Sequence, residues 1–204
     1  MGLKIGLIGA EGKLGKAIST LCPVIPITRA TPRAFFDCDL LIDVSSHKAL
    51  FDNLAFQKPI VIGTTGHLDF TPILDAAKKL PVFYSPNFSL GAAILHKLAS
   101  WIGQHFIADI DLIEIHHAEK KASPSGTALQ LIKSLPSARV HSIRTGKVMG
   151  EHTLIFNNAE ERLTLSHEVH SREAFARGAI AAAHFLIDQP PGLYGMDNLL
   201  NREL

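Results

Sequence analysis

Short apolar runs alternate with longer helical patterns through the first half of the chain, and this alternation restricts the fold more than any other feature. The runs are nearly continuous and rich in branched side chains, which is typical of strands buried on both faces of a parallel sheet. We expect strands at residues 3–8, 24–28, 40–44, 60–63 and 82–85, and helices at 14–21, 48–56 and 71–79. Strands joined by helices in this order predict an α/β domain.

The pattern changes near Asn87, which is the predicted domain boundary. Helices are expected at 92–106 and 173–187, whereas 109–112, 152–156 and 162–169 alternate apolar and polar side chains, with a hairpin turn at 157–160. Such alternation is typical of an antiparallel or mixed sheet with one buried and one open face. The second half therefore predicts a smaller α+β domain whose open sheet face is free for a substrate or another subunit.

Composition excludes several classes of partner. The formal net charge is +1 with 19% charged residues, so nothing indicates a nucleic acid or a membrane surface. No apolar segment reaches the roughly 18 residues of a membrane span, and the N-terminus lacks the features of a signal peptide. Cys22 and Cys38 are interpreted as buried thiols, with a disulfide or metal site as the alternative. We expect a cytoplasmic protein.

A glycine-containing loop follows the first predicted strand and leads directly into a helix. The loop reads Gly9, Ala10, Glu11, Gly12, Lys13, Leu14 and Gly15. Glycines at this spacing let the chain turn tightly and approach a pyrophosphate, which the helix N-terminus then binds through its free N–H groups. An ordinary strand–turn–helix is the alternative, but the position after the first strand favours a Rossmann-type dinucleotide site.

The end of the second predicted strand bears on the choice of nicotinamide cofactor. An acidic residue there would bind the ribose hydroxyls of NADH, but this chain has Thr28 followed by Arg29. Arg29 is therefore a candidate to bind the 2′-phosphate of NADPH, with a solvated loop arginine as the alternative. We expect NADPH, NADH or both as cofactor.

The densest group of reactive side chains lies in the second half. It comprises Glu114, His116, His117 and Lys120, and it precedes a helix predicted to begin at Pro124 and Ser125. A histidine proton donor, a lysine and the exposed N–H groups of Gly126 and Thr127 suit reduction of a small, acidic, unsaturated molecule. The alternatives are a structural histidine pair and a metal site, but the ligand spacing typical of metals is missing, so we predict none.

These residues resemble the signature of dihydrodipicolinate reductases, Glu-x-His-His-x-x-Lys-x-Asp-Ala-Pro-Ser-Gly-Thr-Ala. Other blocks of that family recur in order from residue 3 to about 200. They are the glycine loop and the segments 42–45, 63–66, 87–91, 144–146, 150–152, 171–179 and 191–196. Nine ordered blocks make a chance resemblance improbable.

The resemblance implies roles for individual residues. His116 matches the family's acid/base and Lys120 its second proton donor, while His117, Gly126 and Thr127 match substrate-binding positions. The loops that line the nicotinamide match Gly63, Thr64 and Thr65, and also Ser85, Pro86, Asn87 and Phe88. The implied reaction is NAD(P)H-dependent reduction of 4-hydroxy-tetrahydrodipicolinate, a cyclic unsaturated dicarboxylate, in lysine and diaminopimelate synthesis.

The resemblance also implies an organisation and an assembly. Residues 1–87 and about 178–204 are expected to form the dinucleotide-binding domain, and 88–177 the substrate-binding domain. Relatives assemble as homotetramers through the sheet of the second domain, so a homotetramer is expected here.

The chain departs from the family pattern at several positions. Ala122 and Ser123 replace Asp and Ala of the signature, and Ser123 is a candidate to cap the following helix in place of that Asp. Ala93 replaces a common Asn, and the chain is short for the family. Two other functions stay open: a different nicotinamide enzyme, such as a homoserine or aspartate dehydrogenase, and a non-catalytic dinucleotide-binding redox sensor.

Overall fold

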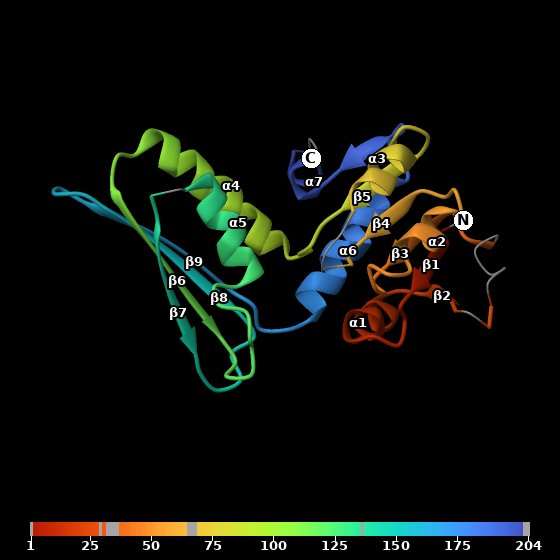
Figure 1. The fold of residues 1–204 in the computed structure, drawn as a ribbon, viewed down its shortest axis with the longest axis horizontal. Coiled ribbons are helices and arrows are strands. Elements are labelled where there is room, and N and C mark those ends of the chain that lie inside the picture. The colour runs from red at the N-terminus through yellow and green to blue at the C-terminus, as the bar shows by residue number, and fades with distance from the viewer. Residues whose placement is uncertain (1, 29, 32–36, 65–68, 136, 202–204) are drawn as a thin grey trace. The chain divides into compact units, whose positions relative to one another are not determined.

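The computed structural model describes residues 2–28, 30–31, 37–64, 69–135 and 137–201 (Figure 1). The chain divides into two compact units, one formed by residues 1–90 and 172–204 and the other by residues 91–171. Among the described residues, no helix is both long enough and apolar enough to cross a membrane.

The first unit contains a six-stranded parallel sheet. Its strands are β1 (Ile5–Ile8), β2 (Val24–Ile27), β3 (Leu40–Asp43), β4 (Ile60–Ile62), β5 (Pro81–Tyr84) and β10 (Gly192–Tyr194). They lie side by side in the order β10-β5-β4-β3-β1-β2, and every neighbouring pair is parallel. Because β1 has β2 on one side and β3 on the other, the order reverses at β1, where α/β sheets bind ligands.

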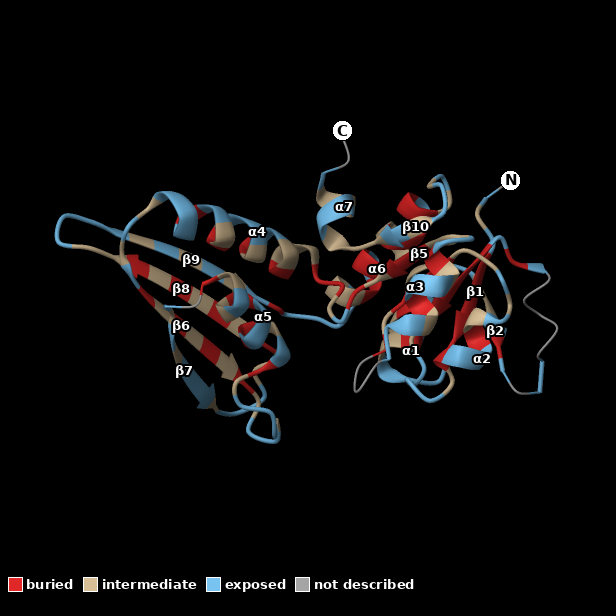
Figure 2. Ribbon diagram, turned by 45° about the horizontal axis from the view of Figure 1, so that its top comes forward, coloured by how far each residue is buried: buried red, intermediate tan, exposed pale blue. Residues whose placement is uncertain are grey.

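Helices cover both faces of this sheet. They are α1 (Lys13–Leu21), α2 (Leu50–Leu54), α3 (Thr71–Ala77), α6 (Glu173–Leu186) and α7 (Met196–Leu200). The core on one face joins α1 and α6 to the sheet, and the core on the other joins α2 and α3. Helix α6 packs closely against the sheet through small residues, since its side chains in this core include the fully buried Ala176, Ala179, Ala182 and Ala183. Figure 2 shows these buried strands and helix faces in red.

The second unit is a mixed sheet with two helices on one face. Its elements are α4 (Leu90–His105), β6 (Asp109–His116), α5 (Gly126–Ser134), β7 (Arg139–Arg144), β8 (Glu151–Asn157) and β9 (Arg162–Glu168). The strand order is β7-β6-β8-β9, in which β6 and β7 are parallel and the other pairs are antiparallel. The alternating side chains of β6 and β8 that face α4 and α5 form the third core.

The predicted fold class is confirmed, as a parallel α/β domain with a smaller mixed-sheet domain. The hairpin between β8 and β9 also forms, since the backbone N–H of Asn158 donates to the carbonyl of Glu161. Three elements, β7, β10 and α7, were not predicted from the sequence. Strand β7 lies at a sheet edge and buries none of its side chains, so it lacks apolar alternation, and β10 has only three residues.

Candidate functional site

The glycine loop forms a tight turn between β1 and α1. Gly9 has a φ of +88°, and a side chain there would bring Cβ within 2.8 Å of the backbone of Val44 and Ser45. At Gly15 a Cβ would lie only 2.2 Å from the carbonyl oxygen of Gly9, so the helix packs directly against the loop. Gly12 caps α1 without a side chain, which leaves the first amides of the helix to solvent or a ligand.

The residues of this loop therefore fit the pyrophosphate of a dinucleotide. They lie at the carboxyl end of β1, beside the loop after β3, which is the position where the strand order reverses. A second feature that fits a bound cofactor is Thr64, which follows β4. Its buried Oγ1 has no hydrogen-bond partner among the described residues. A buried hydroxyl in a predicted cofactor loop is available to a bound group.

The segment after β5 is held by its own polar side chains. Ser85 Oγ donates to the carbonyl of Asn87 at 2.6 Å, and Asn87 Oδ1 accepts from the N–H of Ser89 at 2.9 Å. Phe88 is 2% exposed and its ring stacks on Phe83, so this residue belongs to the core beneath the segment. Two predicted cofactor residues, Arg29 and Thr65, lie outside the described residues.

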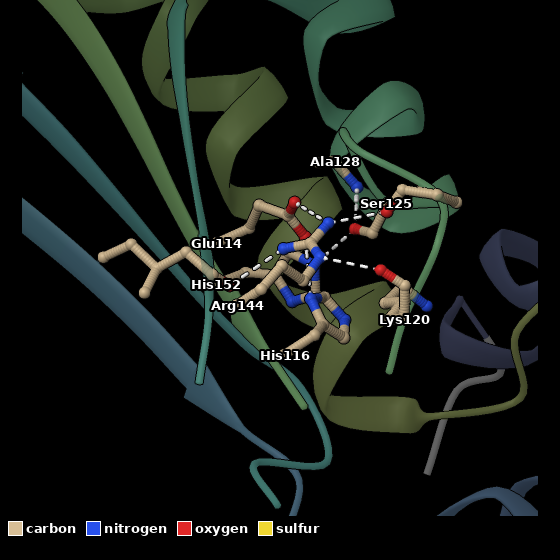
Figure 3. Close-up of polar contacts among 9 residues, drawn as sticks. Glu114, His116, Lys120, Ser125, Ala128, Arg144 and His152 are labelled. Atoms are coloured by element: carbon tan, nitrogen blue, oxygen red, sulfur yellow. Dashed lines mark hydrogen bonds and ion pairs between the residues drawn. The ribbon is translucent and has the colours of Figure 1, made fainter. Parts of the chain in front are cut away.

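In the second unit, strand β6 places Glu114 and His116 on one buried face (Figure 3). Residues two apart on a strand point to the same side, so the two side chains meet beneath α5. Nδ1 of His116 lies 2.7 Å from Oε2 of Glu114. The contact is close but off the direction of an ideal N–H···O hydrogen bond. The carboxylate nevertheless favours a proton on Nδ1, because both side chains are almost fully buried.

The charges around Glu114 and His116 determine which nitrogen of the histidine exchanges a proton. Burial raises the pKa of Glu114, but hydrogen bonds from Ser142, Arg144 and Ser125 outweigh it and hold this pKa to about 2. Burial and the charge of Lys120 lower the pKa of His116, although Glu114 acts in the opposite direction. With an ionised carboxylate against Nδ1, a neutral His116 carries its proton on Nδ1, and Nε2 is the atom that takes up or releases a further proton.

A second buried histidine connects this pair to helix α5. The ring of His152 lies 5.2 Å from that of His116, and its Nε2 lies 3.1 Å from Oγ of Ser125. Ser125 caps α5 by accepting from the N–H of Ala128 at 3.2 Å. The expectation that Ser123 caps this helix is therefore wrong, because the cap belongs next to the first helical residue, Gly126.

The start of α5 is suited to an anion. Gly126 is exposed, and a Cβ there would meet nothing within 4 Å, so open space adjoins the first turn. Thr127, the next residue, is partly buried. The free amides and partial positive charge of a helix N-terminus favour a carboxylate at this position.

The remaining predicted site residues lie in the turn after β6. The backbone N–H of Lys120 donates to the carbonyl of His117 at 3.1 Å, and both side chains are partly buried. Arg144 holds this turn from β7, where it lies opposite His116 in the register. Its guanidinium donates to the carbonyls of Lys120 and Ala122 and to Oε1 of Glu114.

The partnership of Glu114 with His116 was not predicted from the sequence, and neither were the contacts of Arg144, Ser125 and His152 within the site. The partnership of Glu114 with His116 had a signal, since the two residues share a strand face at a separation of two. Arg144 and His152 are 28 and 36 residues beyond His116, and only the strand pairing brings them to it.

Glu114, His116 and His152 each offer a possible metal ligand atom, and these atoms lie within 4.8 Å of one another. The guanidinium of Arg144 already contacts the carboxylate at 2.6 Å. A divalent cation would be placed beside this partly buried positive charge, which is electrostatically unfavourable. The arrangement is better suited to orienting a proton donor, and the expected absence of a metal stays a prediction.

The chain matches the model of the C-terminal part of dihydrodipicolinate reductase over residues 89–200, and that of the N-terminal part over residues 23–88. It is 36% identical to the 4-hydroxy-tetrahydrodipicolinate reductase of Zymomonas mobilis, covering 97% of each chain. It is 33% identical to that of Caldanaerobacter subterraneus, covering 99% of this chain and all of the relative.

The fold has a close counterpart among solved structures. The dipicolinate-bound dihydrodipicolinate reductase from Paenisporosarcina superposes with a TM-score of 0.82 at 21% identity, covering 97% of this chain and 99% of that one. The family matches span both units, and the two relatives correspond over nearly their full length. This chain belongs to the dihydrodipicolinate reductase family.

Proposed function

We propose that the chain is a 4-hydroxy-tetrahydrodipicolinate reductase, which reduces a cyclic unsaturated dicarboxylate with NAD(P)H in lysine and diaminopimelate synthesis. Family membership and relatives that match over nearly their full length support this activity. The observation that carries it is the buried pair of Glu114 and His116 beside the turn of Lys120 and the start of α5. A redox sensor would require the glycine loop but not this second group of residues.

The residues of the second unit divide the work between binding and proton transfer. The first amides of α5, with the hydroxyl of Thr127, would hold a substrate carboxylate, and His117 would contribute a further polar contact. His116 and Lys120 would deliver the proton to the carbon next to the one that is reduced. The positive charge of Lys120 would also offset the charge of the dicarboxylate.

The first unit would hold the cofactor. Gly9 to Leu14 would bind the pyrophosphate, and Gly63, Thr64 and the segment from Ser85 to Phe88 would line the nicotinamide side. When bound, the reduced nicotinamide supplies the hydride. We propose that NADPH is accepted at least as well as NADH, because Thr28 stands where an acidic residue would repel a 2′-phosphate. The Thr28 hydroxyl instead accepts from the N–H groups of Ala30 and Thr31.

The reductase from Paenisporosarcina is bound to dipicolinate in its structure, and a dicarboxylate is likewise the substrate class proposed here. We also propose that the chain acts in the cytoplasm as a homotetramer. The open face of the sheet in the second unit supports this assembly, since it carries the partly exposed side chains of Ile113, Ile143 and Ile155.

The decisive experiment is an assay of the purified protein with freshly generated 4-hydroxy-tetrahydrodipicolinate and each reduced cofactor in turn. Consumption of NADPH that depends on this substrate, at least as efficient as that of NADH, would support the proposal. Aspartate and homoserine with the oxidised cofactors are the comparison substrates. Turnover of either, without activity on the cyclic dicarboxylate, would instead favour an amino-acid dehydrogenase, and cofactor binding without any turnover would favour a sensor.

A further inference from the structure

The side chain of Arg144 contacts two separate parts of the proposed site. It lies at the end of β7, and its side chain is 17% exposed. Nη2 donates to Oε1 of Glu114 at 2.6 Å and to the carbonyl of Ala122 at 2.6 Å. Nε donates to the carbonyl of Lys120 at 3.3 Å, and Nη1 to that of Ile143 at 2.9 Å.

These contacts join two parts of the chain that carry different proposed proton donors. Glu114 is the carboxylate against which His116 rests, and the carbonyls of Lys120 and Ala122 belong to the turn that carries Lys120. We propose that Arg144 is a positioning residue that fixes His116 and Lys120 relative to each other, acting through Glu114 and through the backbone of this turn. The proposal rests on the proposed function and deepens it.

The chemistry of the guanidinium suits this task. It presents several N–H donors in one rigid plane, and so it can hold a carboxylate oxygen and two carbonyls at once. A lysine at this position would keep the positive charge but not the planar set of N–H donors. Glu114 is fully buried, so its carboxylate needs a cationic partner in order to stay ionised against His116.

The same contacts give a structural reason why alanine is accommodated at position 122. Arg144 binds the carbonyl of Ala122 and not its side chain, and the side chain of this residue is exposed. A change of side chain at this position therefore leaves the bond from the guanidinium intact. The family's Asp is not required for the turn to be held.

The test compares Arg144→Met and Arg144→Lys with the unmodified enzyme. We measure kcat, the KM of each substrate, the pH dependence of kcat and the melting temperature. Arg177→Met is the matched control, because Arg177 is an exposed arginine of α6 that forms a 3.4 Å ion pair with Glu173 on the same helix. Nitrogen NMR of the histidine rings follows the pKa and the tautomer of His116 directly, whether or not the protein turns over.

Arg144→Met is expected to lower kcat by about 10²-fold, the scale of a small misplacement of reacting groups. The KM of the cofactor should change little, since the glycine loop lies in the other unit. Loss of a positive charge that lowers the pKa of His116 should move the titration of this histidine to higher pH. Its neutral form should also become a mixture of tautomers. The kcat of Arg144→Lys should fall between those of Arg144→Met and the unmodified enzyme. Arg177→Met should match the unmodified enzyme.

Two results would overturn the proposal. One is a kcat for Arg144→Met within about three-fold of the unmodified value. The other is a lower kcat that accompanies only a lower melting temperature, with the pKa and the tautomer of His116 unchanged, which would indicate a merely structural arginine. If Arg144→Met does not fold, Arg144→Lys with the same measurements decides. Absence of reductase activity in the unmodified protein would refute the proposed function, whereas the NMR arm would still test whether Arg144 positions His116.

Discussion

Oγ of Ser125 lies 3.1 Å from Nε2 of His152, and both side chains are buried. The serine accepts the N–H of Ala128, and its single proton is donated to the carboxylate of Glu114. Oγ of Ser125 therefore accepts from His152, which suits a neutral imidazole with its proton on Nε2. A buried neutral histidine couples the stability of the second unit to pH.

Stability should therefore fall as the pH is lowered through the titration of His152. Burial and the neighbouring His116 lower the pKa of His152 to about 4, against an ordinary value of 6.5. The unfolded chain then binds the proton first, so stabilisation is complete above about pH 6.5 and declines towards pH 4. For this histidine alone, the shift in pKa corresponds to about 3 kcal/mol of the free energy of unfolding.

Urea unfolding at a series of pH values checks this expectation. His152→Asn should be less stable than the unmodified protein at pH 7, and it should lose much of the pH dependence below 6.5. His47→Asn removes an exposed histidine and should leave the dependence unchanged. An identical slope for His152→Asn and the unmodified protein would place the pH-sensitive group elsewhere. His116 and His167, whose pKa values are also lowered by burial, are then the next candidates.

Much of the fold could be predicted because its signals are local. The strands from β1 to β5 are continuous apolar runs, and β8 and β9 alternate over a full strand. The glycine loop was likewise visible as a strand, a turn and a helix in sequence. Strand β7 gave no such signal, because none of its side chains is buried and it is recruited by pairing with β6.

The site was only partly predictable for the same reason. His116, Lys120 and the start of α5 lie within 11 residues of one another, so one stretch of sequence displays them together. The partners of His116 divide into a near one and two distant ones. Glu114 is adjacent on the strand face, but Arg144 and His152 arrive through pairing of β6 with β7 and β8. Spacing cannot reveal contacts that only the sheet creates.

Replacing His116 by alanine should lower turnover far more than it weakens cofactor binding. A positioned acid or base contributes about 10²–10⁴-fold to the rate. Steady-state kinetics give kcat, and fluorescence titration gives the Kd of NADPH, which should be nearly unchanged because the glycine loop lies in the other unit. Turnover within about three-fold of the unmodified enzyme would refute the assignment of His116 as a proton donor.

Thr127→Val should act mainly on substrate binding. It removes a hydroxyl from the first turn of α5 while keeping the branched shape of the side chain. A hydrogen bond to a charged group contributes roughly 1.5–3 kcal/mol, so the KM of the dicarboxylate should rise by about ten-fold or more. Gln130→Ala, on the same helix at an exposed position, is the control. An unchanged KM for Thr127→Val would place the substrate carboxylates away from this helix.

Binding of a dicarboxylate should be accompanied by uptake of a proton at His116. In the free protein, burial and the charge of Lys120 lower the pKa of this histidine below 6.5, so its ring is mostly neutral at pH 7. Two carboxylates bound nearby favour the charged imidazolium and raise this pKa again. Between the two pKa values the complex holds more protons than the free protein, and the dicarboxylate binds more tightly as the pH falls through this interval.

Calorimetric titration with pyridine-2,6-dicarboxylate, in buffers of different ionisation enthalpy, measures the number of protons taken up. The uptake should disappear in His116→Asn and persist in His47→Asn. Binding without proton uptake in the unmodified protein, at every pH from 6 to 8, would show that the dicarboxylate does not reach His116. The proton that Nε2 acquires on binding is the one this histidine can deliver during the reduction, so this measurement links the electrostatics of the buried pair to the proposed reaction.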